Sequence, residues 1–190
     1  DYQKQPMDPF KAFQSHTKKI LKKNAELYYY LLENNFLDVS CEIKNEDARK
    51  TTICSDSIDA IITSPPYVTS YEYADIHQLT GYWYELISDL RGFRKNFIGT
   101  FYSLNKILSC ESEIGNKIIN HLSEKDLRTA REVANYFNDM SLVVKEMHRI
   151  LKPKGYVCLV IGNTSLKSVK IKTAEAISEL FRNNGFEIKD

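Results

Sequence analysis

The 190-residue sequence predicts an α/β fold built on a parallel sheet. Two short apolar runs, at 58–63 and 156–163, have the composition of strands that are buried on both faces. Amphipathic helices are expected at about 10–35, 129–151 and 173–184, so strands and helices alternate along the chain. Strands that are joined through helices lie parallel and connect by right-handed crossovers.

Length and composition fit one globular domain with a sizeable core. The 26 basic and 25 acidic residues give a net charge of +1, so a surface for nucleic acid must be local. The four cysteines include no Cys-x-x-Cys pair, which argues against a metal site and for reduced intracellular thiols. No membrane-spanning run and no signal peptide occur, so we expect a cytoplasmic protein without a membrane partner.

The first helix is expected from Phe10 to about Asn35, because apolar residues recur there at three- and four-residue steps. Its lysine cluster at 18–23 is better explained as a solvated helix face than as a phosphate site. Phe36–Glu46 alternates apolar and polar residues, which predicts a strand.

The strand at Ile58–Thr63 runs into Ser64-Pro65-Pro66-Tyr67, here called the motif loop. Prolines lack an amide hydrogen and cannot continue a ladder, so the strand must stop at Ser64. The loop then lies at the carboxyl end of a central strand, where open α/β sheets bind ligands. Its free carbonyls and the Ser64 hydroxyl can accept hydrogen bonds from an amine, and Tyr67 offers a flat face to a base. The simpler alternative is a proline-stiffened turn after a core strand.

Thr63-Ser64-Pro65-Pro66-Tyr67 resembles the catalytic motif of the DNA amino-methyltransferases, which methylate N4 of cytosine or N6 of adenine. In that family the motif is [Asp/Asn/Ser]-Pro-Pro-[Tyr/Phe], and the Thr-Ser-Pro-Pro-Tyr form is most typical of N4-cytosine enzymes. The resemblance implies a Rossmann-like class I methyltransferase sheet flanked by helices, DNA as substrate and S-adenosyl-L-methionine as cofactor. It also implies catalytic roles for Ser64, Pro65, Pro66 and Tyr67, and it is compatible with a restriction endonuclease partner.

A second part of the resemblance concerns the cofactor. In the resembled family, an acidic residue in a Gly-Asp-Ala-Arg-like stretch contacts the adenine of S-adenosylmethionine. Asp47 matches that position, and Glu46 replaces the usual glycine. Thr63 and Ser64 are the other cofactor-binding candidates. A turn or helix cap after a strand explains Asp47 equally well.

The segment after the motif loop is rich in aromatic residues and resembles one branch of these methyltransferases. There the motif is followed by a tyrosine, His-x-Leu, an aromatic helix and arginines before Ile-Gly-Thr. The candidates for contact with a flipped base or the DNA backbone are Tyr71, Tyr73 and His77. The candidates for phosphate contact are Arg91, Arg94 and Lys95. Trp83 and Tyr84 are expected to pack a helix on the sheet.

Residues 101–128 are interpreted as an insertion or a lid, with loops at 112–116 and 123–126. The helix at 129–151 carries one long apolar stripe, and Lys152-Pro153-Lys154-Gly155 ends it: proline stops the helix and glycine permits the turn. The strand at 156–163 follows. The helix at 173–184 is closed by Gly185, and Phe186 should begin a further strand.

One expected feature is missing. Class I methyltransferases bind the methionine end of their cofactor on a glycine-rich loop, but the seven glycines here include no Gly-x-Gly. We therefore expect residues 1–190 to be a partial catalytic domain, incomplete at both ends, that binds the cofactor weakly by itself. The loop should lie upstream of Asp1, or downstream of Asp190 in a permuted member of the family. The alternatives are methylation of RNA or of a protein glutamine, and a non-catalytic methyltransferase-like subunit that binds DNA or a partner.

Overall fold

The computed structural model describes residues 8–68, 73–100 and 107–189. The chain divides into two compact units, Asp1–Asn45 and Glu46–Asp190. In the described ranges no helix is long and apolar enough to cross a membrane.

The first unit contains one long helix, α1 (Pro9–Glu33). It begins where Asp8 accepts a 3.0 Å hydrogen bond from the Lys11 amide, with proline in the first turn, where its missing N–H costs nothing. This confirms the helix expected at about 10–35. The strand predicted at 36–46 is wrong, because these residues form no strand. Alternation marks a strand only where a neighbouring strand pairs its backbone groups, and no pairing is present at 36–46.

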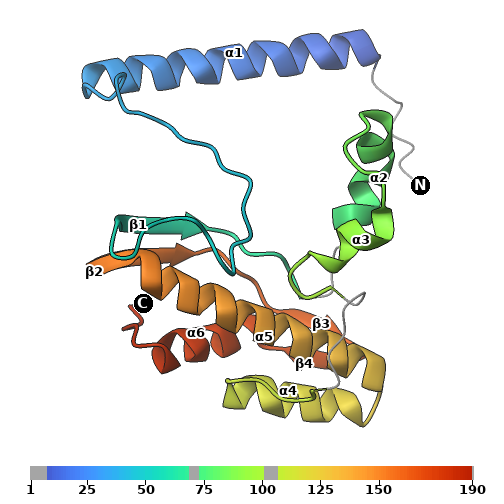
Figure 1. Ribbon diagram of the computed structural model, residues 1–190. Helices are drawn as coiled ribbons and strands as arrows, with labels where there is room; N and C mark the ends of the chain where they lie inside the picture. Colours follow the sequence, from blue (N-terminus) through green and yellow to red (C-terminus); the bar gives the residue numbers. More distant parts are fainter. Residues whose placement is uncertain (1–7, 69–72, 101–106, 190) are drawn as a thin grey trace. The chain divides into compact units, whose positions relative to one another are not determined.

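The second unit is built around two parallel strands, β1 (Ile58–Thr63) and β2 (Leu151–Leu159), which lie side by side in Figure 1. Their register pairs Ile61 with Val157 and Thr63 with Leu159. The α/β class and the end of the first strand before Ser64 are thus confirmed. Its described strands are this parallel pair and one hairpin, not a larger sheet.

The junction between helix and β2 differs from the prediction. The register shifts opposite Ile58–Ala60, and the left-handed residue there is Lys154, with φ 68°, rather than Gly155. Gly155 is needed for space: a Cβ at this position would lie 2.9 Å from the Asp59 carbonyl oxygen. Gly155 therefore makes room for the close approach of β1. The expectation from the sequence, that it permits the turn, is wrong.

The core lies between α5 (Leu127–Ile150), α4 (Glu113–Ser123) and α6 (Thr173–Asn183), and α5 supplies the largest share of its buried residues. One side of the sheet packs on it through Ile61, Val157 and Leu159. Helices α5 and α6 confirm the predicted helices to within two residues. The loop predicted at 112–116 is wrong, because Ser112 caps α4: its Oγ accepts from the Gly115 amide at 2.9 Å.

A β-hairpin was not predicted from the sequence. Strands β3 (Thr164–Leu166) and β4 (Val169–Ile171) pair antiparallel around Lys167 and Ser168, which have φ of 50° and 59°. Such a turn usually contains Asn or Gly, so this sequence gives no turn signal. Gly185 has φ 87° and ends α6 as expected. The strand predicted from Phe186 is wrong: Phe186 instead packs edge-to-face on Phe181 and His148.

The aromatic segment forms helix α2 (Tyr73–Trp83), followed by the short α3 (Leu90–Lys95). These two helices contact each other, since Asp75 of α2 pairs with Arg94 of α3. Gly81 of α2 lies against Ile87 in the segment that connects them. The expected packing of Trp83 and Tyr84 on the sheet is wrong, because Trp83 is 84% exposed and Tyr84 is exposed as well. α2 packs through Gly81 and leaves the side chains of Tyr82 and Trp83 exposed.

Candidate functional site

The motif loop is bound to the end of β2. The Thr63 carbonyl accepts from the Val160 amide at 3.0 Å, and the Ser64 hydroxyl donates to the Val160 carbonyl at 3.0 Å. Because Ser64 uses its only hydrogen in this bond, the lone pairs of its oxygen are available to a donor from outside. The loop therefore presents Ser64 as an acceptor.

Buried and exposed residues alternate along the loop. Pro65 and the following Val68 are buried, whereas Ser64 is exposed and Tyr67 is 45% exposed. The buried residues anchor the loop, and the exposed ones face solvent at the carboxyl end of β1. This is the arrangement expected of a ligand-binding edge.

The backbone of the loop has a further anchor on α5. The hydroxyl of Tyr136 donates a 3.0 Å hydrogen bond to the Pro66 carbonyl. Tyr136 is 1% exposed, and this burial raises the pKa of its phenol, so it is a permanent donor. Sequence reasoning missed this residue. The available signal was a tyrosine within the apolar stripe of the helix, since a buried phenol needs a hydrogen-bond partner.

Asp47 lies in a turn where its carboxylate is oriented by Arg49. It accepts from the Arg49 amide at 2.9 Å and from the guanidinium at 2.8 and 3.0 Å. These side-chain hydrogen bonds are the main cause of the lowered pKa of Asp47. The carboxylate is half-exposed and can accept from a ligand as well. The alternative explanation of Asp47 as a turn cap also holds, because its Oδ1 accepts a hydrogen bond from the Arg49 amide.

Arg49 connects this turn to two other segments. Its guanidinium donates to Asp139 on α5 and to the Asn96 carbonyl after α3, both at 3.1 Å. Asp139 also accepts from the Gly99 amide at 2.8 Å. Asp139 and Tyr136 are three residues apart on α5 and so are neighbours on its surface. The structure thus brings the Asp47 turn, the motif loop and residues 96–99 to one turn of α5.

The predicted DNA contacts are only partly described. Tyr71 lies outside the described residues, and Tyr73 is the first residue of α2. His77 is exposed on α2, and Arg91 and Lys95 are exposed on α3.

Arg94 differs from the other basic candidates. Its side chain is largely buried and pairs with Asp75 on α2. It therefore stabilises the contact between the two helices, whatever else it binds.

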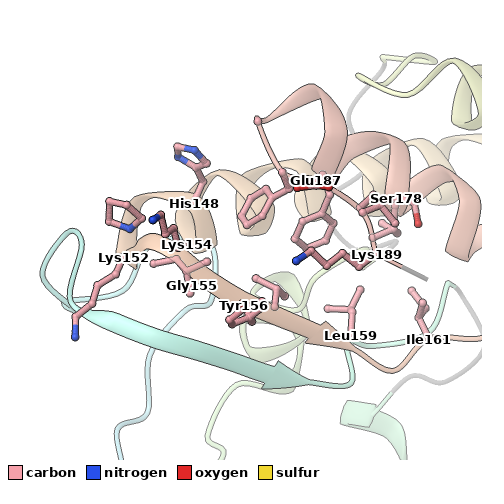
Figure 2. A pocket seen from close by; sticks show the side chains of 18 of the residues that line it. His148, Lys152, Lys154, Gly155, Tyr156, Leu159, Ile161, Ser178, Glu187 and Lys189 are labelled. Atoms are coloured by element: carbon pink, nitrogen blue, oxygen red, sulfur yellow. The ribbon is translucent and has the colours of Figure 1, made fainter.

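A groove of about 960 Å³ lies elsewhere, between β2 and α6, and Figure 2 shows it with Leu159, Ile161 and Ser178 around it. Its lining includes no residue of the motif loop. In the described part of the chain no cluster of His, Cys, Asp or Glu could bind a metal ion, and the four cysteines form no disulfide. The candidate site is therefore the surface around the motif loop.

Residues 58–190, which begin at β1 and include the motif loop, match the model of a DNA methylase family of the N6/N4 type. The type II methyltransferase M.MvaI of Kocuria varians is 29% identical over 136 residues, which cover 65% of this chain and 30% of that protein. No solved structure matches the chain. Since the family match spans well over half of the sequence, the chain belongs to the N6/N4-type DNA methylase family.

Proposed function

We propose that this chain forms the target-base side of a DNA methyltransferase site that transfers a methyl group from S-adenosyl-L-methionine to N4 of cytosine. The observation that carries the proposal is the Ser64–Val160 hydrogen bond, which makes the exposed Ser64 oxygen an acceptor beside the exposed ring of Tyr67. The family match and the type II methyltransferase relative support methyl transfer to DNA. The Thr-Ser-Pro-Pro-Tyr form of the motif favours cytosine N4 over adenine N6.

The chemistry follows from the acceptors. The two hydrogens of the exocyclic amine are bound by the Ser64 oxygen and the Pro65 carbonyl, while Tyr67 stacks on the ring. Such bonds localise the nitrogen lone pair and stabilise the positive charge that develops on nitrogen. S-adenosylmethionine supplies an electrophilic methyl group on a sulfonium. The N–C bond forms as the S–C bond breaks, and the methylated nitrogen then loses one proton to water.

The cofactor-binding role falls to Asp47, Thr63 and Ser64. The ionised, half-exposed carboxylate of Asp47 fits the exocyclic amine of an adenine, because it is an acceptor that Arg49 holds in one orientation. Thr63 and Ser64 lie at the end of β1, on the segment that the Tyr136–Pro66 bond anchors to α5.

DNA contact is assigned to the segment that follows the motif loop. Tyr71, Tyr73 and His77 contact the flipped base or its backbone, and Arg91, Arg94 and Lys95 contact phosphates. Arg91 and Lys95 carry most of this charge, since the Asp75 carboxylate partly neutralises Arg94. These contacts complete the substrate side of the proposed site.

The test is mass spectrometry of nucleosides from cells that express the full-length protein. We expect N4-methylcytosine with the wild type and none with Pro65→Ala or Tyr67→Ala, although circular dichroism of both variants stays native. Pro153→Ala, at an exposed proline on β2, is the matched control and should retain activity. N6-methyladenine instead would overturn the choice of base. No modified DNA base, or full activity in either loop variant, would overturn the mechanism.

A further inference from the structure

The contact between Tyr136 and the motif loop has a clear geometry. The hydroxyl lies 3.0 Å from the Pro66 carbonyl oxygen, and the residue is 1% exposed. Because Pro66 precedes Tyr67 directly, a bond to its carbonyl fixes the peptide plane from which Tyr67 departs. One end of the loop is thus attached to β2 through Ser64 and the other end to α5 through Pro66.

The ring of Tyr136 is itself fixed by its surroundings. Gly99, with φ 69°, lies so close that a Cβ there would be 2.9 Å from the ring and 3.0 Å from the Tyr136 Cβ. Phe137 also packs edge-to-face on the ring, with ring centroids 5.6 Å apart. The hydroxyl therefore has little freedom to leave the Pro66 carbonyl. Its hydrogen bond restrains the motif loop relative to α5.

We propose that Tyr136 is a positioning residue for methyl transfer, because its buried hydroxyl fixes the Pro66 carbonyl and with it the orientation of Tyr67 and of the Pro65 acceptor. This inference rests on the proposed function of the motif loop. Tyr136 touches neither base nor cofactor in this assignment. It acts on the conformation of the groups that do, and a loop without this bond samples orientations in which the amine is not held for transfer.

Tyr136→Phe in the full-length protein is the test, because it removes one oxygen and keeps the ring. With unmethylated phage DNA of mixed sequence and tritiated S-adenosylmethionine, we expect kcat to fall about threefold to tenfold, the worth of one hydrogen bond. KM for DNA should change by less than about twofold, since an interaction that matters only in the transition state leaves KM unaltered. A rise in KM at constant kcat would overturn the proposal.

A second readout does not depend on activity. In hydrogen–deuterium exchange, the peptide spanning Thr63–Val68 should exchange about threefold to tenfold faster in Tyr136→Phe, while peptides from α4 and α6 keep their rates. Ile119→Val, a fully buried change in α4, is the control for general loss of stability and should leave kcat unchanged.

The two readouts separate the possible failures. Unchanged exchange in the loop, or faster exchange everywhere, refutes the positioning role. If the wild type is inactive but the Thr63–Val68 peptide exchanges faster in Tyr136→Phe, the proposed function and the role of Tyr136 in catalysis are both refuted. Only the restraint of the motif loop by Tyr136 is then supported.

Discussion

Glu146 on α5 is a buried carboxylate whose removal should lower the stability of the fold. One of its carboxylate oxygens accepts from the Thr51 amide at 2.8 Å, the Thr51 hydroxyl at 2.7 Å and the Arg149 guanidinium at 2.7 Å. The other accepts from Arg149 at 2.9 Å. Arg149 in turn donates to the Ile53 carbonyl at 2.8 Å, so the pair fastens the segment before β1 to α5.

Glu146→Gln keeps the shape and one acceptor but removes the charge. A hydrogen bond to a charged group contributes about 1.5–3 kcal/mol when its partner is left unsatisfied. Glu146 is 8% exposed, so water does not replace the contribution that is lost at this position in the variant. The Arg149 side chain is 38% exposed, so water partly replaces its lost partner. We therefore expect the free energy of unfolding at pH 7 to fall by about 2 kcal/mol, which lowers Tm by about 4–8 °C in a protein of this size.

The effect should depend on pH in a defined direction. The hydrogen bonds from Arg149, above all, lower the pKa of Glu146 from 4.5 to about 2. A carboxyl whose pKa is lower in the folded state stabilises above its unfolded pKa, and the stabilisation is lost as pH falls through the folded pKa. The difference between wild type and Glu146→Gln should thus be constant above about pH 5 and shrink between about pH 4.5 and pH 2.

Urea unfolding followed by circular dichroism at pH 7, 5, 4 and 3 measures this difference. Glu124→Gln, at an exposed position after α4, is the matched control and should be neutral at pH 7. Equal stability of wild type and Glu146→Gln at pH 7, or a difference that does not change down to pH 3, would refute the reasoning.

Two further substitutions test the packing around the site. Gly99→Ala combines a left-handed backbone with contact on Tyr136, so we expect a loss of about 1–3 kcal/mol in urea unfolding, whereas Gly162→Ala, with open space around it, should be neutral. Ser112→Ala removes the cap of α4 and the donor to Glu179, and should lower the free energy of unfolding by about 1–2 kcal/mol; an unchanged urea midpoint would show that the cap contributes nothing.

The elements with local signals could be predicted from the sequence. Helix α5 has a long apolar stripe with a 3.6-residue period, and β1 ends at two prolines that lack amide hydrogens. The β3–β4 hairpin could not be predicted, because Lys167 and Ser168 adopt left-handed φ without the usual Asn or Gly. The strand expected at 36–46 is a false prediction. Its alternating pattern is present in the local sequence, but a strand also needs a partner strand, which a local pattern cannot show.

For the candidate site, the sequence by itself determined the family and the stiff acceptor loop, because the Ser-Pro-Pro-Tyr chemistry is contained in four adjacent residues. Only the tertiary structure decided which distant groups support that loop. Tyr136 and the Pro66 carbonyl are 70 residues apart, and Arg49 and Asp139 are 90 apart. A hydrogen bond needs two atoms about 3 Å apart, and that proximity is created by packing α5 against the segments it anchors, which no local pattern records.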